Sequence, residues 1–305
     1  MPELPEVETV RIGLSQTTCD RLITKVEVLL DRMIASPAPL AFQQGLEGTF
    51  ISGWSRRGKY LLAKLMRPSV EHSLAPQSGW EAGWIGVHLR MSGQLLWMDS
   101  AEPLHKHTRV RLHFAKNPAQ KSRKKPEPTD LDRELRFVDQ RTFGQMWWIP
   151  PDQDPNQVMG GMGALGPEPL SPEFSLAYLQ ALCAKRDRPI KTLLLDQTLI
   201  AGLGNIYVDE ALFLGGLLPT RPCRSLTTPE VERLHGAIES VIQQALTQGG
   251  TTFSDFRQVS GVNGNYGAIA WVYGRAGEPC RHCQTPLAKM RLAGRSCHFC
   301  PQCQG

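Results

Sequence analysis

The chain has 305 residues, 41% of them hydrophobic, and a formal net charge of +5. This length and composition are sufficient for two packed domains and exclude wholesale disorder. The mild basic excess permits a polyanionic partner but does not demand one. The acidic N-terminus, MPELPE, is unlike a signal peptide, and no apolar run approaches the roughly 18 residues of a membrane span. We therefore expect a cytoplasmic protein without membrane contact, whose eight cysteines are reduced or metal-bound.

The first half of the sequence predicts one helix followed by strands. The helix is expected at 5–14, because Pro5 suits a first helical position and Glu6 and Glu8 favour the positive end of the helix dipole. Segments rich in β-branched and aromatic residues follow at 22–30, 50–65, 84–98, 109–114 and 135–149. These segments predict an antiparallel β-sandwich. The polar stretches at 69–83 and 116–133 are expected to be exposed loops, and the basic run at 121–125 a solvated part of the second.

The second half has a helical pattern. It begins after residues 150–172, which are dense in Pro and Gly as a linker is. Ser171 with Pro172, and Thr228 with Pro229, predict the starts of two helices. The apolar stripe from Val231 to Ala245 has helical spacing. A helical second domain is the prediction.

Four cysteines near the C-terminus have the spacing of a zinc site. They are Cys280, Cys283, Cys300 and Cys303. Two Cys-x2-Cys pairs predict two knuckles around one tetrahedral Zn²⁺, and four protein ligands leave no open position, so the zinc is expected to be structural. Cys297 also stands in register with Cys300, which leaves Cys297/Cys300 open as the second knuckle, although Pro301 favours Cys300/Cys303. From residue 271 onward five basic residues accompany one acidic residue, as in a module that docks phosphates.

The N-terminus could supply a nucleophile. Removal of Met1 would leave Pro2 as a free secondary amine, and an α-amino group titrates near about pH 8, so part of it is neutral at pH 7. Attack on a sugar C1′ would give a cationic iminium, and Glu3 and Glu6 are close enough in sequence to transfer protons. Composition alone favours a plainer interpretation, in which Pro2 merely starts the chain and the acids decorate a helix N-terminus.

Five motifs change that balance. They are PELPEVETV at 2–10, RGKYL at 57–61, HLRMSG at 88–93, FVDQRTFG at 137–144 and GLGNIY at 202–207. Together with the cysteine pairs, these motifs resemble, in order and over nearly the whole chain, those of the formamidopyrimidine-DNA glycosylase family. The resemblance implies a β-sandwich domain with an N-terminal helix at 2–150, a linker at 151–170, a helix–two-turns–helix domain at 171–268 and a zinc ribbon at 269–305, an α+β architecture.

The resemblance also implies roles for individual residues. Pro2 would be the nucleophile, Glu3 the acid/base that opens the deoxyribose ring, and Glu6 an assistant at the sugar or base. The implied DNA contacts are Lys59, His88 and Arg295 at phosphates, Asn205 at the start of the second helix of the helix–two-turns–helix, and Met91, Arg141 and Phe143 as side chains that fill the void left by an extruded nucleotide. Gly202 and Gly204 would let the backbone approach a phosphate. The loop at 251–266 would close over 8-oxoguanine, although its composition departs from the family pattern, and Cys297 stands where Thr is common.

The implied function is excision of oxidised purines from double-stranded damaged DNA by a monomer with one zinc ion, followed by β,δ-elimination at the abasic site. Two alternatives stay open from the residues. One is a related glycosylase of the endonuclease VIII type for oxidised pyrimidines, against which the Met91, Arg141 and Phe143 pattern argues. The other is a zinc-ribbon DNA-binding protein without catalysis.

Overall fold

A computed structural model describes residues 1–69, 79–115, 132–251, 259 and 264–305. These residues form two compact units. Of the described residues, the first unit contains 1–2, 7–69, 79–115, 132–163 and 259, and the second contains 3–6, 164–251 and 264–305. In the described part of the chain, no helix combines the length and the apolar character that crossing a bilayer requires.

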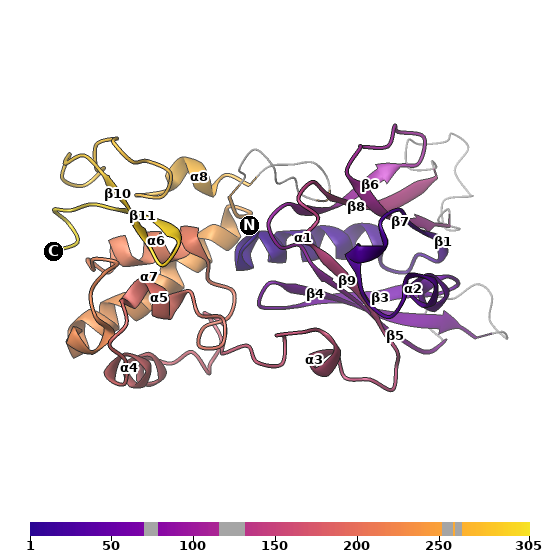
Figure 1. Ribbon diagram of the computed structural model, residues 1–305, viewed down its shortest axis with the longest axis horizontal. Coiled ribbons are helices and arrows are strands. Elements are labelled where there is room, and N and C mark those ends of the chain that lie inside the picture. The colour runs from indigo at the N-terminus through magenta and orange to yellow at the C-terminus, as the bar shows by residue number, and fades with distance from the viewer. Residues whose placement is uncertain (70–78, 116–131, 252–258, 260–263) are drawn as a thin grey trace. The chain divides into compact units, whose positions relative to one another are not determined.

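The first unit is a sandwich of two sheets (Figure 1). Its elements are α1 (Leu4–Thr18), β1 (Ile23–Val28), η1 (Asp31–Met33), β2 (Ile34–Ser36), α2 (Pro39–Leu46), β3 (Phe50–Arg57), β4 (Tyr60–Pro68), β5 (Gly79–His88), β6 (Gly93–Asp99), β7 (Thr108–Phe114), β8 (Arg133–Asp139), β9 (Gln145–Ile149) and α3 (Pro155–Val158). One sheet has the order β1-β7-β8-β6 and the other β2-β9-β5-β4-β3. Val7, Val10 and Leu14 of α1 are buried in the core that both sheets line.

The predicted sandwich is confirmed, with one correction to its strand directions. β2 pairs with β9 in parallel, whereas the other strand pairs of both sheets are antiparallel. The chain between β2 and β9 passes through most of the sandwich, so no hairpin turn dictates their relative direction.

The predicted strand segments also divide differently in the structure. The segment 50–65 is a hairpin, because Gly58 has a φ of +56° and starts a two-residue turn between the paired Arg57 and Tyr60. The segments 84–98 and 135–149 each contribute one strand to each sheet. β5 begins at Gly79, so residues 79–83 are strand and not loop, while the basic run at 121–125 lies outside the described residues.

The second unit is helical. Its elements are α4 (Leu176–Ala184), α5 (Ile190–Leu194), α6 (Asn205–Leu214), η4 (Cys223–Ser225), α7 (Thr228–Thr247), α8 (Tyr266–Ile269), β10 (Ala288–Leu292) and β11 (Arg295–Phe299). α5 and α6, with the turns between them, are the predicted helix–two-turns–helix. The buried stripe of α7, from Val231 to Ala245, packs into the same apolar core as α4, α5 and α6.

Both predicted helix starts in this unit are displaced. α4 begins after Ser175, whose hydroxyl accepts a hydrogen bond from Tyr178 N, because Ser171 instead closes a turn with Phe174. α7 is capped by Thr227 and not by Thr228, and the Glu230 carboxylate accepts the Thr227 N–H at 2.7 Å. The reciprocal capping box between Thr227 and Glu230 sets the start of α7, although Pro229 alone would favour Thr228 as the cap.

Candidate active site

Residues 3 and 4 of the N-terminal segment form hydrogen bonds with the start of α6 and with the turn before it. Glu3 is 2% exposed, and its Oε1 accepts a hydrogen bond from Ile206 N at 3.0 Å. Leu4 N donates to Gly202 O at 3.0 Å. Residues 3–6 thus belong to the second unit although α1 continues into the first. Pro2, which precedes them, is buried within the first unit.

Glycines make room for this segment. A Cβ on Gly204 would lie 2.2 Å from Cδ of Glu3, and one on Gly202, which has a φ of +92°, would lie 2.6 Å from Cδ1 of Leu4. The turn before α6 therefore requires glycine at both positions because the chain's own N-terminus occupies the space. This differs from the expectation that these glycines serve a phosphate.

A buried hydrogen-bond network holds Glu6. Its Oε1 accepts the N–H of Thr251 at 2.7 Å and the hydroxyl of Tyr207, and its Oε2 accepts the N–H of Glu3 at 2.8 Å. Burial and the neighbouring Glu6 carboxylate raise the pKa of Tyr207 well above its usual value, so the phenol remains a donor. Thr251 also lines a pocket of about 260 Å³ together with Ile206 and Tyr273.

Lys59 and His88 lie at neighbouring strand ends in the first unit. Lys59 is the second residue of the β3–β4 turn and is 6% exposed. His88 ends β5, pairs with Tyr60 across the sheet and packs edge-on against the Tyr60 ring at 4.5 Å. Burial, with the nearby positive charges of Arg90 and Lys59, lowers the pKa of His88 to about 3. Its Nδ1 accepts Arg90 N at 3.0 Å, so in the neutral ring Nε2 carries the proton and can donate it to a phosphate.

Met91, Arg141 and Phe143 come together on two loops. We call residues 89–92 and 140–144 the crossover loops, because each connects one sheet of the sandwich with the other. Met91 is 40% and Phe143 54% exposed, and the Arg141 guanidinium lies 5.1 Å from the centroid of the Phe143 ring. All three side chains are therefore exposed on the crossover loops.

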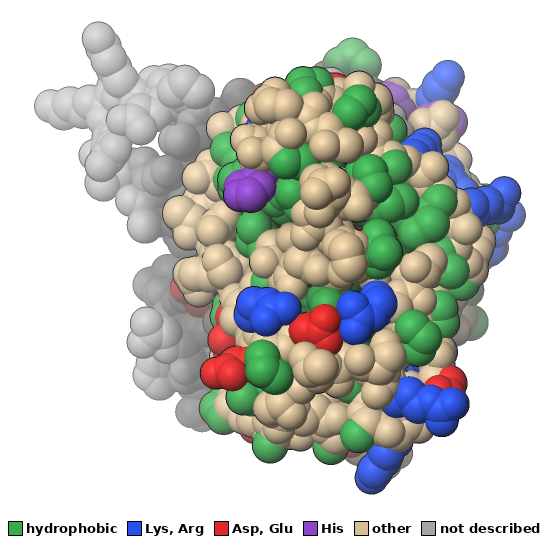
Figure 2. Space-filling model, turned by 90° about the vertical axis from the view of Figure 1, so that its left-hand side faces the viewer, with side chains coloured by type: hydrophobic (Ala, Val, Ile, Leu, Met, Phe, Trp, Pro, Cys, Tyr) green, Lys and Arg blue, Asp and Glu red, His purple; other side chains and the backbone are tan. Residues whose placement is uncertain are grey.

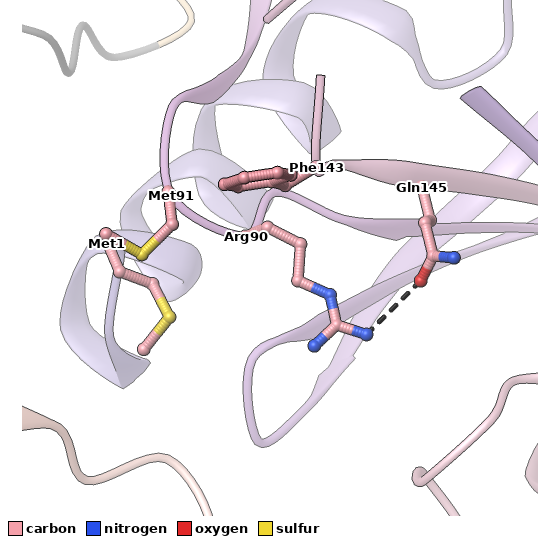
Figure 3. A pocket seen from close by; sticks show the side chains of 5 residues that line it. All are labelled: Met1, Arg90, Met91, Phe143 and Gln145. Carbon is pink, nitrogen blue, oxygen red and sulfur yellow. Dashed lines mark hydrogen bonds between the residues drawn. The ribbon is translucent and has the colours of Figure 1, made fainter. Parts of the chain in front are cut away.

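A pocket of about 390 Å³ opens beside these loops. Met1, Arg90, Met91, Phe143 and Gln145 line it. Figure 3 shows the Met1 side chain next to Met91, and the Phe143 ring above Arg90. The Arg90 guanidinium donates to Gln145 Oε1 at 3.2 Å.

The sulfurs of the four predicted zinc ligands converge. Those of Cys280, Cys283, Cys300 and Cys303 all lie within 4.8 Å of one another, as a single tetrahedral ion requires. Cys297 is buried and does not belong to this group. Backbone N–H groups of His282 and Cys303 point at the sulfurs of Cys280 and Cys300, at 3.4 Å each, as in knuckles that stabilise thiolates. The chain therefore carries one structural zinc site.

Arg295 is exposed at the start of β11, beside a hairpin turn in which Ala293 and Gly294 both have positive φ. Three charged residues that sequence reasoning missed hold this part of the chain: Lys191 and Asp209 bind the hairpin, and Glu210 binds the segment 271–273 that precedes it. Lys191 Nζ donates to Asp209 Oδ1 at 2.6 Å and to Ser296 O at 2.7 Å. Glu210 accepts the N–H groups of residues 271, 272 and 273. Their signal in the sequence was charge at positions where the helical apolar pattern required burial.

The basic excess of the terminal module is partly used internally. Arg275 and Arg281 donate to backbone carbonyl groups at 268–279, whereas Lys289, Arg291 and Arg295 are exposed. On the face drawn in Figure 2, an acidic side chain lies between two basic ones near the centre, and further Lys and Arg side chains lie along the upper right edge. Most of the predicted base-binding loop at 251–266 lies outside the described residues.

Comparisons with known proteins agree with this geometry. Residues 1–146 match the family model of the formamidopyrimidine-DNA glycosylase N-terminal domain, residues 165–257 that of its H2TH domain, and residues 277–305 a zinc finger found in FPG and IleRS. The chain is 57% identical to the formamidopyrimidine-DNA glycosylase of Trichodesmium erythraeum over 305 residues, which is 100% of both chains. It is 54% identical to that of a Synechococcus strain over 304 residues, covering 100% of this chain and 99% of the relative.

Among solved structures, the chain is similar to Lactococcus lactis Fpg in complex with DNA containing an abasic site. The TM-score is 0.83 at 32% identity, covering 99% of each chain. Family models, full-length relatives and solved structures thus agree over the entire sequence. The chain belongs to the formamidopyrimidine-DNA glycosylase family.

Proposed function

We propose that the chain excises oxidised purines from duplex DNA through a covalent intermediate on Pro2. The unprotonated Pro2 nitrogen attacks C1′, and the damaged base leaves with the electron pair of its bond to C1′ and takes up the proton that the Pro2 nitrogen loses. Glu3 protonates O4′ as the deoxyribose ring opens to the iminium. The resulting iminium acidifies C2′–H. Loss of that proton expels the 3′ phosphate by β-elimination, and δ-elimination then expels the 5′ phosphate.

The placement of Glu3 carries this proposal. If the acids only decorated a helix start, they would be solvated. Instead Glu3 is buried, accepts Ile206 N, and lies against a turn that can hold no Cβ at Gly204. A buried carboxylate that is held in one position by several contacts, next to a potential nucleophile, is typical of a site that transfers protons.

Removal of Met1 is a condition for activity. While Met1 is attached, the Pro2 nitrogen belongs to an amide and has no nucleophilic lone pair. The Met1 side chain also fills part of the pocket beside Met91 and Phe143. Cleavage of Met1 would free the nitrogen and empty that space at once.

The remaining residues would hold and open the DNA. Exposed Met91, Arg141 and Phe143 suit the filling of the void left by an extruded nucleotide, with Arg141 facing the orphaned base. Lys59, His88, Asn205 and Arg295 would contact phosphates. The pocket lined by Thr251 would receive the base. Because the substrate would be chromosomal DNA, we also propose that the protein acts as a monomer in the cytoplasm, at the nucleoid.

Borohydride trapping tests the proposal. The protein, shown by mass spectrometry to lack Met1, is incubated with an 8-oxoguanine:cytosine duplex and borohydride, and the adduct is located by peptide mapping. We expect the adduct on the peptide that begins at Pro2 and its loss in Glu3→Gln, which keeps the shape of the side chain but cannot transfer the proton. An adduct on Lys59, or none at all, would refute the assignment.

The two alternatives make different predictions. An endonuclease VIII-type enzyme would excise thymine glycol faster than 8-oxoguanine, so both duplexes are compared. A non-catalytic zinc-ribbon protein would be indifferent to Pro2→Gly and to a retained Met1.

A further inference from the structure

Asp139 joins the two crossover loops. This carboxylate is fully buried at the end of β8. Its Oδ1 accepts the Ser92 hydroxyl at 2.6 Å and the N–H of Arg141 at 3.1 Å, and its Oδ2 accepts the N–H of Gly144 at 2.8 Å. The Arg141 N–H is also 3.1 Å from the Ser92 hydroxyl oxygen, so one loop contacts the other directly.

Strand register explains why one side chain reaches both loops. Asp139 pairs with Gly93 in one sheet, and His88 pairs with Gln145 in the other. Both loops therefore leave the same two points of the sandwich and run side by side between the sheets. A Cβ on Gly144 would lie 2.6 Å from the Phe137 ring and 3.0 Å from the Asp139 carboxylate, so the second loop is closely fitted around this anchor.

Each loop also contains a strained residue. Arg90, next to Met91, has a φ of 52°, and Thr142, between Arg141 and Phe143, has a φ of 54°. A β-branched residue such as threonine is rare in this left-handed region. Such conformations persist only where the surroundings dictate them, and they cluster at functional sites. The carboxylate of Asp139 supplies that constraint through the N–H groups on both sides of Thr142.

We propose that Asp139 is a positioning residue that, with Ser92, holds Met91, Arg141 and Phe143 in one arrangement, so that the three side chains enter the DNA stack as a preformed unit. Asp139 itself, being buried, touches no DNA. This inference rests on the proposed function, because it concerns how the void beside an extruded nucleotide is filled. The competing explanation is that Asp139 only stabilises the sandwich.

Ser92→Ala separates these explanations. It removes both hydrogen bonds of the Ser92 hydroxyl, to Asp139 Oδ1 and from Arg141 N, and leaves the two N–H bonds of Asp139 in place. The matched control is Ser52→Ala, an exposed serine of β3 whose hydroxyl donates to Lys64 O at 3.3 Å. Asp139→Asn is the stronger variant, because one carboxylate oxygen becomes an NH₂ group that faces an N–H donor.

The experiment measures single-turnover excision of 8-oxoguanine opposite cytosine and opposite adenine, with 2-aminopurine beside the lesion to report unstacking. Cleavage of a single-stranded abasic oligonucleotide, in which no duplex void is filled, is measured in parallel. We expect Ser92→Ala to slow duplex excision by about 10- to 100-fold, the range for one hydrogen bond to a charged group. Discrimination between cytosine and adenine should also decrease, because Arg141 is less well placed.

Single-strand cleavage should match that of Ser52→Ala, even where the loss of the Ser92 hydrogen bonds to a buried carboxylate lowers the melting temperature of Ser92→Ala. Equal losses on duplex and single strand, or unchanged cytosine/adenine discrimination in Ser92→Ala, would overturn the positioning role alone, provided that the wild-type protein forms the borohydride adduct. A wild-type protein that forms no adduct would overturn the proposed function and, with it, this inference.

Discussion

The contact between Gly204 and Glu3 gives a sharp test of how the acid is held. In Gly204→Ala the new methyl group would lie 2.2 Å from Cδ of Glu3, whereas ordinary contact begins at 3.4 Å. The backbone at Gly204, with φ −141° and ψ −163°, is extended and suits alanine. The carboxyl group must therefore move by about 1.2 Å, and the bond from Ile206 N at 3.0 Å lengthens or breaks.

A misplacement of about 1 Å at reacting groups can cost about 100-fold in rate. We therefore expect Gly204→Ala to lower the single-turnover rate of 8-oxoguanine excision by about that factor. Binding to a duplex with a non-cleavable abasic analogue should change little, because the proposed role of the carboxylate is in proton transfer and not in DNA binding. The matched control is Gly236→Ala, in the middle of α7, where a Cβ meets nothing within 4 Å. That change should leave the rate unaltered and stabilise the protein by about 0.5–1 kcal/mol.

Wild-type excision by Gly204→Ala would refute the reasoning, since it would mean that the position of Glu3 is not critical. A parallel loss of rate and of DNA binding would mean that the turn before α6 had collapsed. Melting curves of both glycine variants, recorded together, distinguish that collapse from a local displacement of Glu3.

Three further changes test other parts of the structure. Lys191→Met leaves the fully buried Asp209 without its cation and should lower the free energy of unfolding by about 3–5 kcal/mol, measured by urea denaturation. Bonding to Lys25, acting against partial burial, lowers the pKa of Glu27 from 4.5 to about 2, so its stabilising effect is complete above pH 4.5 and is lost as the pH falls toward 2. Thermal melts of Glu27→Gln should therefore depend less on pH within that window, and an unchanged slope would contradict the assignment. Cys303→Ser should lose the bound zinc and the ability to bind DNA, whereas Cys297→Ser should keep one zinc per chain by elemental analysis.

The sequence could predict those features that depend on residues close together in the chain. The alternation of apolar residues in β7, the apolar stripe of α7 and the Cys-x2-Cys spacing each depend on a few consecutive turns or residues. Even so, a choice between two adjacent caps, as at Thr227 and Thr228, depends on which hydroxyl forms the reciprocal bond with Glu230. Single-residue preferences for an N-cap do not contain that information.

The rest depends on partners that are distant in the sequence. Ser92 and Asp139 are 47 positions apart, and Glu3 and Ile206 are 203 apart. No regular spacing in the sequence indicates that such residues are partners. The sequence alone shows only that a charged residue stands within an apolar pattern. The family resemblance identified Met91, Arg141 and Phe143, but the carboxylate that holds their loops emerged only from the strand register of both sheets.

The contact of Glu3 with the start of α6 changes what we expect of this helix N-terminus. A helix N-terminus offers N–H donors to an anion, which suggested a phosphate site at Asn205. Here the N–H of Ile206 is given to Glu3, a carboxylate of the chain itself. The Asn205 side chain, which we propose contacts a phosphate, has its Nδ2 3.4 Å from the Ser296 hydroxyl oxygen of the zinc hairpin. In the proposed reaction Glu3 donates a proton to O4′, so the side chain that accepts the Ile206 N–H must carry that proton at this step.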